Sequence, residues 1–71
     1  MNDPTTAIAA TLDQVGARLK RLRTRRGVTL TSLAVTTGIS KSTLSRLETG
    51  QRRPTLELLL PLALAFDVPL D

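Results

Sequence analysis

Hydrophobic residues recur at helical spacing along the first third of the chain. Five apolar positions follow one another at intervals of four, three, four and three residues: Ile8, Leu12, Val15, Leu19 and Leu22. This spacing places them on one stripe of an α-helix. Gly27 stands where a left-handed C-terminal cap is needed, so we expect the helix to end near Arg26. Asp3 and Pro4 can supply its N-cap and first turn.

Three shorter helices are predicted after Gly27, and each is preceded by a Ser or Thr that can cap its N-terminus. They occupy about residues 30–37, 41–49 and 56–66. The caps are Thr29, Ser40 and Thr55, and Gly38 and Gly50 end the first two helices. Residues 68–71 look like the start of a fifth helix. No strand pattern appears, so the sequence predicts an all-α fold of four to five short helices.

The last of these helices, residues 56–66, is apolar on all sides, because Glu57 is its one polar side chain. A surface helix of a small monomer keeps a polar face, so something should cover the second side of this one. One hypothesis is a dimer interface or a docked C-terminal continuation, formed by Leu58, Leu62 and Leu64. The alternative is burial under the first and a fifth helix. Pro61 should kink the helix near Glu57.

The helix at residues 41–49 has one apolar and one polar side. At roughly 100° per residue, Leu44 and Leu47 share one side and Glu48 points back toward the protein. The other side carries cations and hydroxyls without a carboxylate, which suits base edges and phosphates: Lys41, Ser42, Ser45, Arg46 and Thr49. Two short helices joined through residues 38–40 fit a helix-turn-helix, in which the second helix occupies the DNA major groove.

The charge distribution favours a polyanionic partner. All ten Lys and Arg residues lie between positions 18 and 53, where Glu48 is the only acid, so this segment carries +9 in a chain of +4. Nucleic acid and an anionic membrane surface both fit this field, and a solvated basic surface is the simpler alternative. The apolar stripe of the first helix contains no aromatic residue and is needed inside the fold, which argues against membrane binding.

The composition of the 71-residue chain excludes most catalytic mechanisms. Without Cys or His it has no disulfide, thiol nucleophile, imidazole base or usual zinc site. The acids are scattered and no phosphate-cradling loop occurs, so we predict no enzyme activity, no metal and no cofactor. With Phe66 as the one aromatic residue, platforms for stacking unpaired bases are also missing. The absence of a long apolar run predicts a cytoplasmic protein, associated with the nucleoid when bound to DNA.

One extended motif carries a family resemblance: Leu33-Ala34-x-x-x-Gly38-Ile39-Ser40-x-x-x-Leu44-Ser45-x-Leu47-Glu48-x-Gly50, followed by Arg53-Pro54. It resembles the Cro and phage-repressor type of helix-turn-helix family, also called the XRE family. The resemblance covers about Val15 to Asp71 and implies a lambda-repressor-like compact bundle. The chain departs from the family pattern at Leu30, where Gln commonly meets a phosphate, and at Ser32, where Glu would complete a capping box.

The resemblance also implies roles for individual residues. The expected base readers are Lys41, Ser42 and Arg46. The expected contacts to the DNA backbone are Ser40, Thr43, Ser45, Gly50, Gln51, Arg52 and Arg53. Arg23 lies near the apolar stripe of the first helix and therefore faces the fold, and family members pair an Arg here with the Glu at the end of the recognition helix. We therefore predict a structural ion pair between Arg23 and Glu48.

The leading functional hypothesis is a sequence-specific, double-stranded DNA-binding transcriptional regulator. The family resemblance implies that it is a repressor and that it binds DNA as a two-fold dimer. The alternative is a protein-interaction module on the same fold, antitoxin-like or bridging. We expect residues 1–11 to form an arm or helix extension and residues 12–71 to form the DNA-binding domain. A C-terminal sensor domain can follow in a longer protein.

Overall fold

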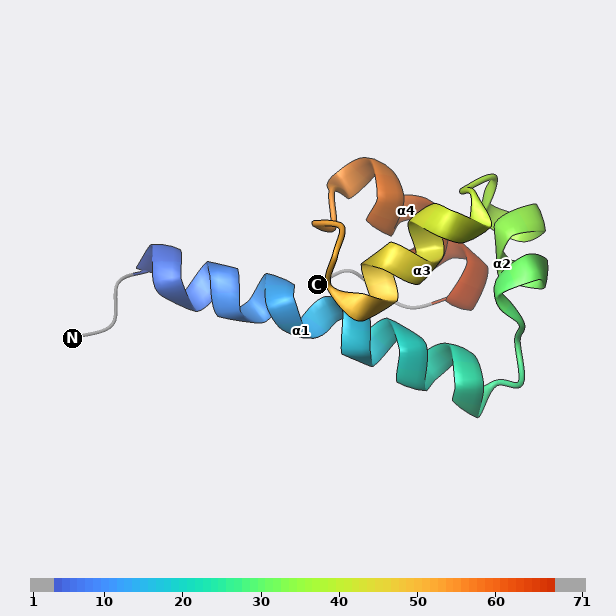
Figure 1. Ribbon diagram of the computed structural model, residues 1–71, viewed down its shortest axis with the longest axis horizontal. Coiled ribbons are helices and arrows are strands. Elements are labelled where there is room, and N and C mark those ends of the chain that lie inside the picture. Colours follow the sequence, from blue (N-terminus) through green and yellow to red (C-terminus); the bar gives the residue numbers. More distant parts are fainter. Residues whose placement is uncertain (1–3, 68–71) are drawn as a thin grey trace.

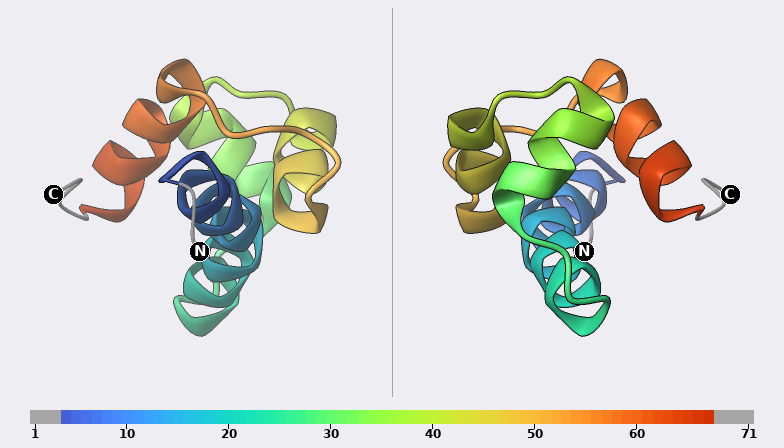
Figure 2. Two further views of the ribbon diagram at one scale, coloured as in Figure 1. Left: turned by 90° about the vertical axis from the view of Figure 1, so that its left-hand side faces the viewer. Right: turned by 90° about the vertical axis from the view of Figure 1, so that its right-hand side faces the viewer.

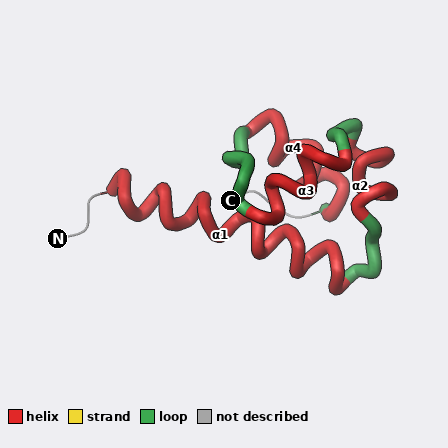
Figure 3. Tube along the Cα trace, viewed as in Figure 1, coloured by secondary structure: helices red, strands yellow, loops and turns green. Residues whose placement is uncertain are grey.

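The computed structural model describes residues 4–67 of the backbone and the side chains of residues 14–67. Four helices follow one another: α1 (Pro4–Arg25), α2 (Leu30–Thr37), α3 (Lys41–Thr49) and α4 (Leu56–Phe66) (Figure 1). Short loops join them, and the described residues contain no strand (Figure 3). The predicted all-α class and helix ranges are confirmed. The predicted start of a fifth helix lies outside the described residues.

The helices are arranged around the C-terminal half of α1. With 22 residues α1 is about 33 Å long, and its N-terminal part extends beyond the other three helices (Figure 1). α1 packs against α3, and α2 packs against both α3 and α4. Seen end-on, α3 and α4 lie on opposite sides of α1 (Figure 2). No helix in residues 4–67 combines the length and hydrophobicity needed to span a membrane.

Each helix contributes to one hydrophobic core, which consists of leucines and one phenylalanine. The buried residues are Leu19, Leu33, Leu44, Leu47, Leu62 and Phe66. The stripe predicted for α1 enters this core through Leu19 and, partly buried, Leu22. Burying one such side chain contributes roughly 1.5–3 kcal/mol. Leu44 on α3, with none of its surface exposed, lies at the centre of this packing.

Among the described residues, the helix caps follow the sequence prediction with one exception; the predicted N-cap Asp3 lies outside them. The Thr29 side chain accepts the N–H of Ser32 at 3.0 Å, and the Ser40 side chain accepts the N–H of Thr43 at 3.1 Å. Gly38 ends α2 in the left-handed conformation, at φ 75°. Thr55 stands at the N-cap of α4, but its side chain makes no capping hydrogen bond. The expectation of a side-chain cap there was therefore wrong.

α4 has one buried side and one exposed side, although its sequence is apolar all round. Leu62 is only 3% exposed and belongs to the core of its own chain, so it is not available to a partner. Leu58 is half-buried against the same core. Leu64, by contrast, is 82% exposed. The exposed ridge of α4 therefore differs from the predicted set Leu58, Leu62 and Leu64.

The side of α4 next to α1 lines an apolar groove. Its lining residues come from these two helices: Val15, Arg18, Leu19, Leu22, Leu59, Leu62, Ala63 and Phe66. α4 continues as a single helix through Pro61. The kink expected near Glu57 stays a prediction.

Candidate nucleic-acid interface

The polar side of α3 lies on the surface because the opposite side is anchored in the core. Leu44 and Leu47 are buried, which fixes the rotation of the helix about its axis. Solvent-exposed side chains cover the other side: Lys41, Ser42, Ser45, Arg46 and Thr49. Among the described side chains, neither Lys41 nor Arg46 forms an ion pair with an acid. The three residues predicted to read bases, Lys41, Ser42 and Arg46, therefore share one accessible surface.

The backbones of α1 and α3 approach each other closely at Gly16. A Cβ atom built on Gly16 would lie 2.1 Å from the carbonyl oxygen of Leu47 and 3.1 Å from that of Glu48. Only glycine leaves room for this approach. Gly16 therefore sets how deeply the C-terminal part of α3 is seated against α1. Sequence reasoning missed this residue, although a glycine inside a helical pattern is a signal of close packing.

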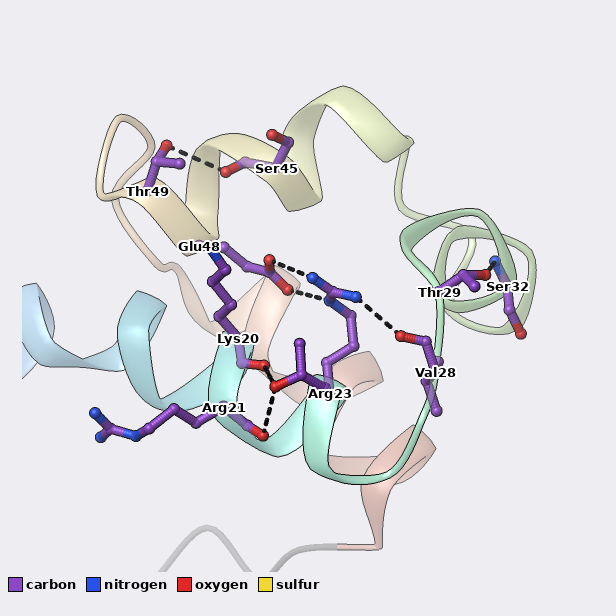
Figure 4. A network of polar contacts seen from close by, with 10 residues as sticks. Lys20, Arg21, Arg23, Val28, Thr29, Ser32, Ser45, Glu48 and Thr49 are labelled. Carbon is purple, nitrogen blue, oxygen red and sulfur yellow. Dashed lines mark hydrogen bonds and ion pairs between the residues drawn. The ribbon is translucent and has the colours of Figure 1, made fainter.

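The predicted ion pair between Arg23 and Glu48 is present (Figure 4). Arg23 Nε donates to Glu48 Oε2 at 2.6 Å, and Arg23 Nη2 donates to Oε1 at 3.0 Å. The third guanidinium nitrogen, Nη1, donates to the carbonyl oxygen of Val28 at 2.9 Å. The pair thus connects α1, the loop before α2 and the end of α3. The two side chains are 13% and 4% exposed.

This bidentate pair controls the charge at the end of α3. The hydrogen bond to Glu48 raises the pKa of Arg23 above its ordinary value, so the guanidinium stays charged. Glu48 is the only acid on α3, and its charge is neutralised inside the protein. The exposed side of α3 therefore presents no carboxylate that would repel phosphate.

At the N-terminus of α3, Ser40 and Thr43, both predicted to contact the DNA backbone, form hydrogen bonds with each other. Ser40 Oγ accepts the N–H of Thr43 and donates its own proton to Thr43 Oγ1 at 2.7 Å. The Ser40 hydroxyl is therefore engaged in the cap. An anion at this end of α3 would therefore be bound by the free backbone N–H groups of the first turn. Such N–H groups at a helix N-terminus favour phosphate.

The basic loop after α3 is tied to the end of the helix. The carbonyl oxygen of Arg46 accepts the N–H groups of Gln51 and Arg52 at 2.9 and 3.1 Å. Gly50 permits this reversal because its φ is 82°. The side chains of Gln51, Arg52 and Arg53 are exposed, so all three predicted loop contacts are accessible to a partner.

A second arginine joins distant parts of the fold and was not predicted. Arg26 Nη1 donates to the carbonyl oxygen of Phe66 at 2.6 Å. Its guanidinium carbon also lies 5.6 Å from the centre of the Phe66 ring, a cation–π distance. The contact fixes the end of α4 to the end of α1. Forty residues separate the partners in sequence, and the helical pattern of either segment gives no sign of the contact.

Comparison with known proteins agrees with this geometry. A helix-turn-helix domain model matches residues 14–71. The HTH-type transcriptional regulator SutR of Escherichia coli is 41% identical over 51 residues, which are 72% of this chain and 29% of SutR. The HTH-type transcriptional regulator PrpR of Mycobacterium tuberculosis is 45% identical over 53 residues, 75% of this chain and 11% of PrpR. The chain thus spans less than a third of these relatives.

A solved structure resembles the whole bundle. The crystal structure of the restriction-modification controller protein C.AhdI from Aeromonas hydrophila superposes with a TM-score of 0.77 at 38% sequence identity. The match covers 84% of this chain and 91% of C.AhdI. It supports the four-helix arrangement and the position of α3 within it. The family match covers most of the chain, and we conclude that the chain belongs to the helix-turn-helix domain family, in its XRE-like form.

Proposed function

We propose that this domain binds double-stranded DNA sequence-specifically and regulates transcription, with α3 in the major groove. The observation that carries the proposal is the exposed, carboxylate-free side of α3. Its orientation is fixed by the buried Leu44 and Leu47, and the charge of Glu48 is held inside by Arg23. Such a surface offers hydrogen-bond donors to base edges without repelling the phosphates on either side.

In this proposal three residues read bases. Arg46 presents a planar fork that matches O6 and N7 of guanine, and Lys41 reaches the same acceptors as a single charge. Ser42 is short and less selective. All three are exposed on α3, so no rearrangement of the core is needed for them to enter a groove.

Affinity in this proposal comes from the backbone phosphates. The N-terminus of α3 supplies backbone N–H groups around Ser40 and Thr43, and Ser45 adds a hydroxyl on the exposed side. The loop supplies Gly50, Gln51 and the two cations Arg52 and Arg53. Because each neutralised phosphate releases counterions, the logarithm of the binding constant should fall with the logarithm of salt concentration by about 0.9 per phosphate.

We further infer a homodimer that represses by covering its operator. Two α3 helices about 34 Å apart would enter successive major grooves on one side of the DNA. Because SutR and PrpR extend well beyond the matched region, we also propose that the natural protein carries a C-terminal sensor domain. Such a regulator would act in the cytoplasm, on the nucleoid.

The test is selection from a labelled, partly randomised duplex pool, measured by fluorescence anisotropy at low and moderate salt and followed by sequencing of the bound fraction. We expect a steep salt dependence and an enriched motif with two-fold symmetry. Binding without an enriched motif would contradict sequence-specific recognition. No binding at either salt concentration would favour the protein-interaction module instead.

A further inference from the structure

One hydroxyl group of the chain follows closely after two adjacent arginines. Thr55 is preceded by Arg52, Arg53 and Pro54, and Leu56 comes next. No other Ser or Thr of the 71-residue sequence has arginines both two and three residues before it. Protein kinases with an acidic substrate groove select their hydroxyl groups by such a charge pattern. The segment from Arg52 to Leu56 therefore has the charge pattern of a substrate for this class of enzyme.

The Thr55 hydroxyl is free to react. Thr55 stands at the N-cap of α4, but its side chain makes no capping hydrogen bond. The capping side chains of Thr29 and Ser40, by contrast, each accept a backbone N–H. The first turn of α4 is formed by the main chain instead, because the carbonyl oxygen of Thr55 accepts the N–H groups of Leu58 and Leu59 at 3.0 and 2.9 Å. The start of α4 therefore does not depend on this hydroxyl.

The segment around Thr55 is accessible to an enzyme. Residues 51–55 lie outside the helices and cross from the end of α3 to the start of α4 (Figure 2). The side chains of Arg52, Arg53 and Thr55 are exposed, and Leu56 is 65% exposed. The backbone of Thr55 is extended, at φ −118° and ψ 162°. A modifying enzyme can thus reach the hydroxyl together with the side chains before and after it.

A phosphate on Thr55 would change the charge of a loop that the proposed function needs. Arg52 and Arg53 are the two cations proposed to contact the DNA backbone. Phosphothreonine carries about −1.5 to −2 at pH 7, so the charge of the segment 51–55 would fall from +2 to about zero. The two residues from Arg53 to Thr55 span at most about 7 Å of chain, which is less than the roughly 8 Å over which physiological salt screens a charge. The phosphate would therefore offset the nearby arginines and repel the DNA backbone.

We propose that Thr55 is a phosphorylation site for a Ser/Thr protein kinase that selects basic substrates, and that its phosphorylation releases the domain from DNA. In the reaction, Thr55 Oγ1 forms a bond to the γ-phosphorus of ATP. The bond from that phosphorus to the β–γ bridging oxygen breaks, ADP leaves, and an aspartate of the kinase takes the hydroxyl proton. The proposal rests on the proposed function, because DNA is the partner that the phosphate repels.

The fold can accept this phosphate. It would lie at the N-terminus of α4, where the helix dipole favours negative charge. Glu57, in the first turn of α4, opposes a second negative charge, but its side chain is exposed, so solvent weakens the repulsion. The core residues of α4, Leu62 and Phe66, lie about two and three turns further along the helix. Phosphorylation should thus change the charge of the loop and leave the core packing intact.

The first part of the test contains no DNA. The protein is incubated with ATP and the catalytic subunit of cyclic-AMP-dependent protein kinase, which selects substrates with such arginines, and its phosphates are mapped by mass spectrometry of proteolytic peptides. We expect one phosphate, on Thr55. Thr55→Val should not be phosphorylated, whereas Thr31→Val, which changes an exposed threonine of α2, should be phosphorylated like wild type. Wild type without phosphate on Thr55, or Thr55→Val with as much phosphate as wild type, would overturn the proposal.

The second part compares unmodified and phosphorylated protein on the selected duplex, by fluorescence anisotropy over a range of salt concentrations. Phosphorylation should weaken binding at least about tenfold and lower the salt slope by about 1.8, as expected for the loss of two phosphate contacts. Circular dichroism should show the same melting curve for both forms to within a few degrees.

Unchanged affinity would overturn the release from DNA, and so would a loss of affinity accompanied by unfolding, because the charge of the loop would then not be its cause. Failure of the unmodified protein to bind any duplex would contradict the proposed function, and with it the release from DNA. The first part of the test would still decide whether Thr55 is the modified residue, so the two failures are distinguishable.

Discussion

Replacing Gly16 with Ala tests the packing of α3 on α1, because helix propensity and packing predict opposite effects. Alanine favours a helix interior over glycine by roughly 1 kcal/mol. In this fold, however, the new Cβ would lie 2.1 Å from the carbonyl oxygen of Leu47. Real Cβ contacts do not fall below 3.0 Å, so α1 and α3 must separate. A backbone carbonyl cannot swing aside as a flexible side chain can.

The expected net effect is destabilisation. Overpacking of this kind costs about 1–3 kcal/mol and occasionally more, and the clash with backbone places Gly16→Ala toward the upper end. After the gain in propensity of roughly 1 kcal/mol is subtracted from an overpacking cost of about 3 kcal/mol, we expect a loss of about 2 kcal/mol. For a domain of this size, each kcal/mol corresponds to roughly 4–8 °C in melting temperature.

The assay is urea and thermal denaturation followed by circular dichroism, with Ala17→Gly as the control. Ala17 is exposed on α1 next to Gly16, so Ala17→Gly measures helix propensity without a change in packing. Propensity alone predicts opposite signs for the two variants, whereas the close approach predicts that both destabilise. If Gly16→Ala stabilised the protein by about as much as Ala17→Gly destabilised it, the reasoning would be refuted.

Three other predictions concern the contacts that hold the helices. Arg23→Gln leaves the buried Glu48 carboxylate without its partner, so the free energy of unfolding measured in urea should fall by about 3 kcal/mol. Unchanged stability with abolished DNA binding would show that Arg23 contacts DNA instead. Ser40→Ala should lower the free energy of unfolding by about 1 kcal/mol in urea denaturation, and Thr55→Ala should lower it clearly less, because of these two residues only Ser40 makes a capping hydrogen bond. Equal losses of stability in the two variants would contradict the assigned caps. Arg26→Ala should lower the melting temperature by several degrees, and no change would mean that its bond to Phe66 contributes nothing.

The parts of the fold that could be predicted from the sequence depend on local signals. Thr29, Ser40, Gly38 and Gly50 mark the ends of α2 and α3 by their own conformational preferences, so these boundaries follow from the chain itself. The Arg23–Glu48 pair followed from a helical position facing the fold together with the family resemblance.

The parts that could not be predicted depend on contacts between helices. α4 has almost no polar residue to indicate its outer side, so periodicity could not distinguish the buried Leu62 from the exposed Leu64. The role of Gly16 becomes apparent only when a second backbone lies against it. The contact between Arg26 and Phe66 likewise joins two helix ends that are adjacent only in the folded chain.

The most direct test of sequence-specific recognition by α3 is the specificity ratio of Arg46→Ala. The affinities of wild type and variant would be measured by anisotropy, at one fixed salt concentration, for the selected duplex and for a scrambled duplex of the same composition. If Arg46 reads a base, the variant should lose about 1–3 kcal/mol on the selected duplex and much less on the scrambled one. An equal loss on both duplexes would mean that Arg46 only neutralises phosphate, and would contradict its role as a base reader.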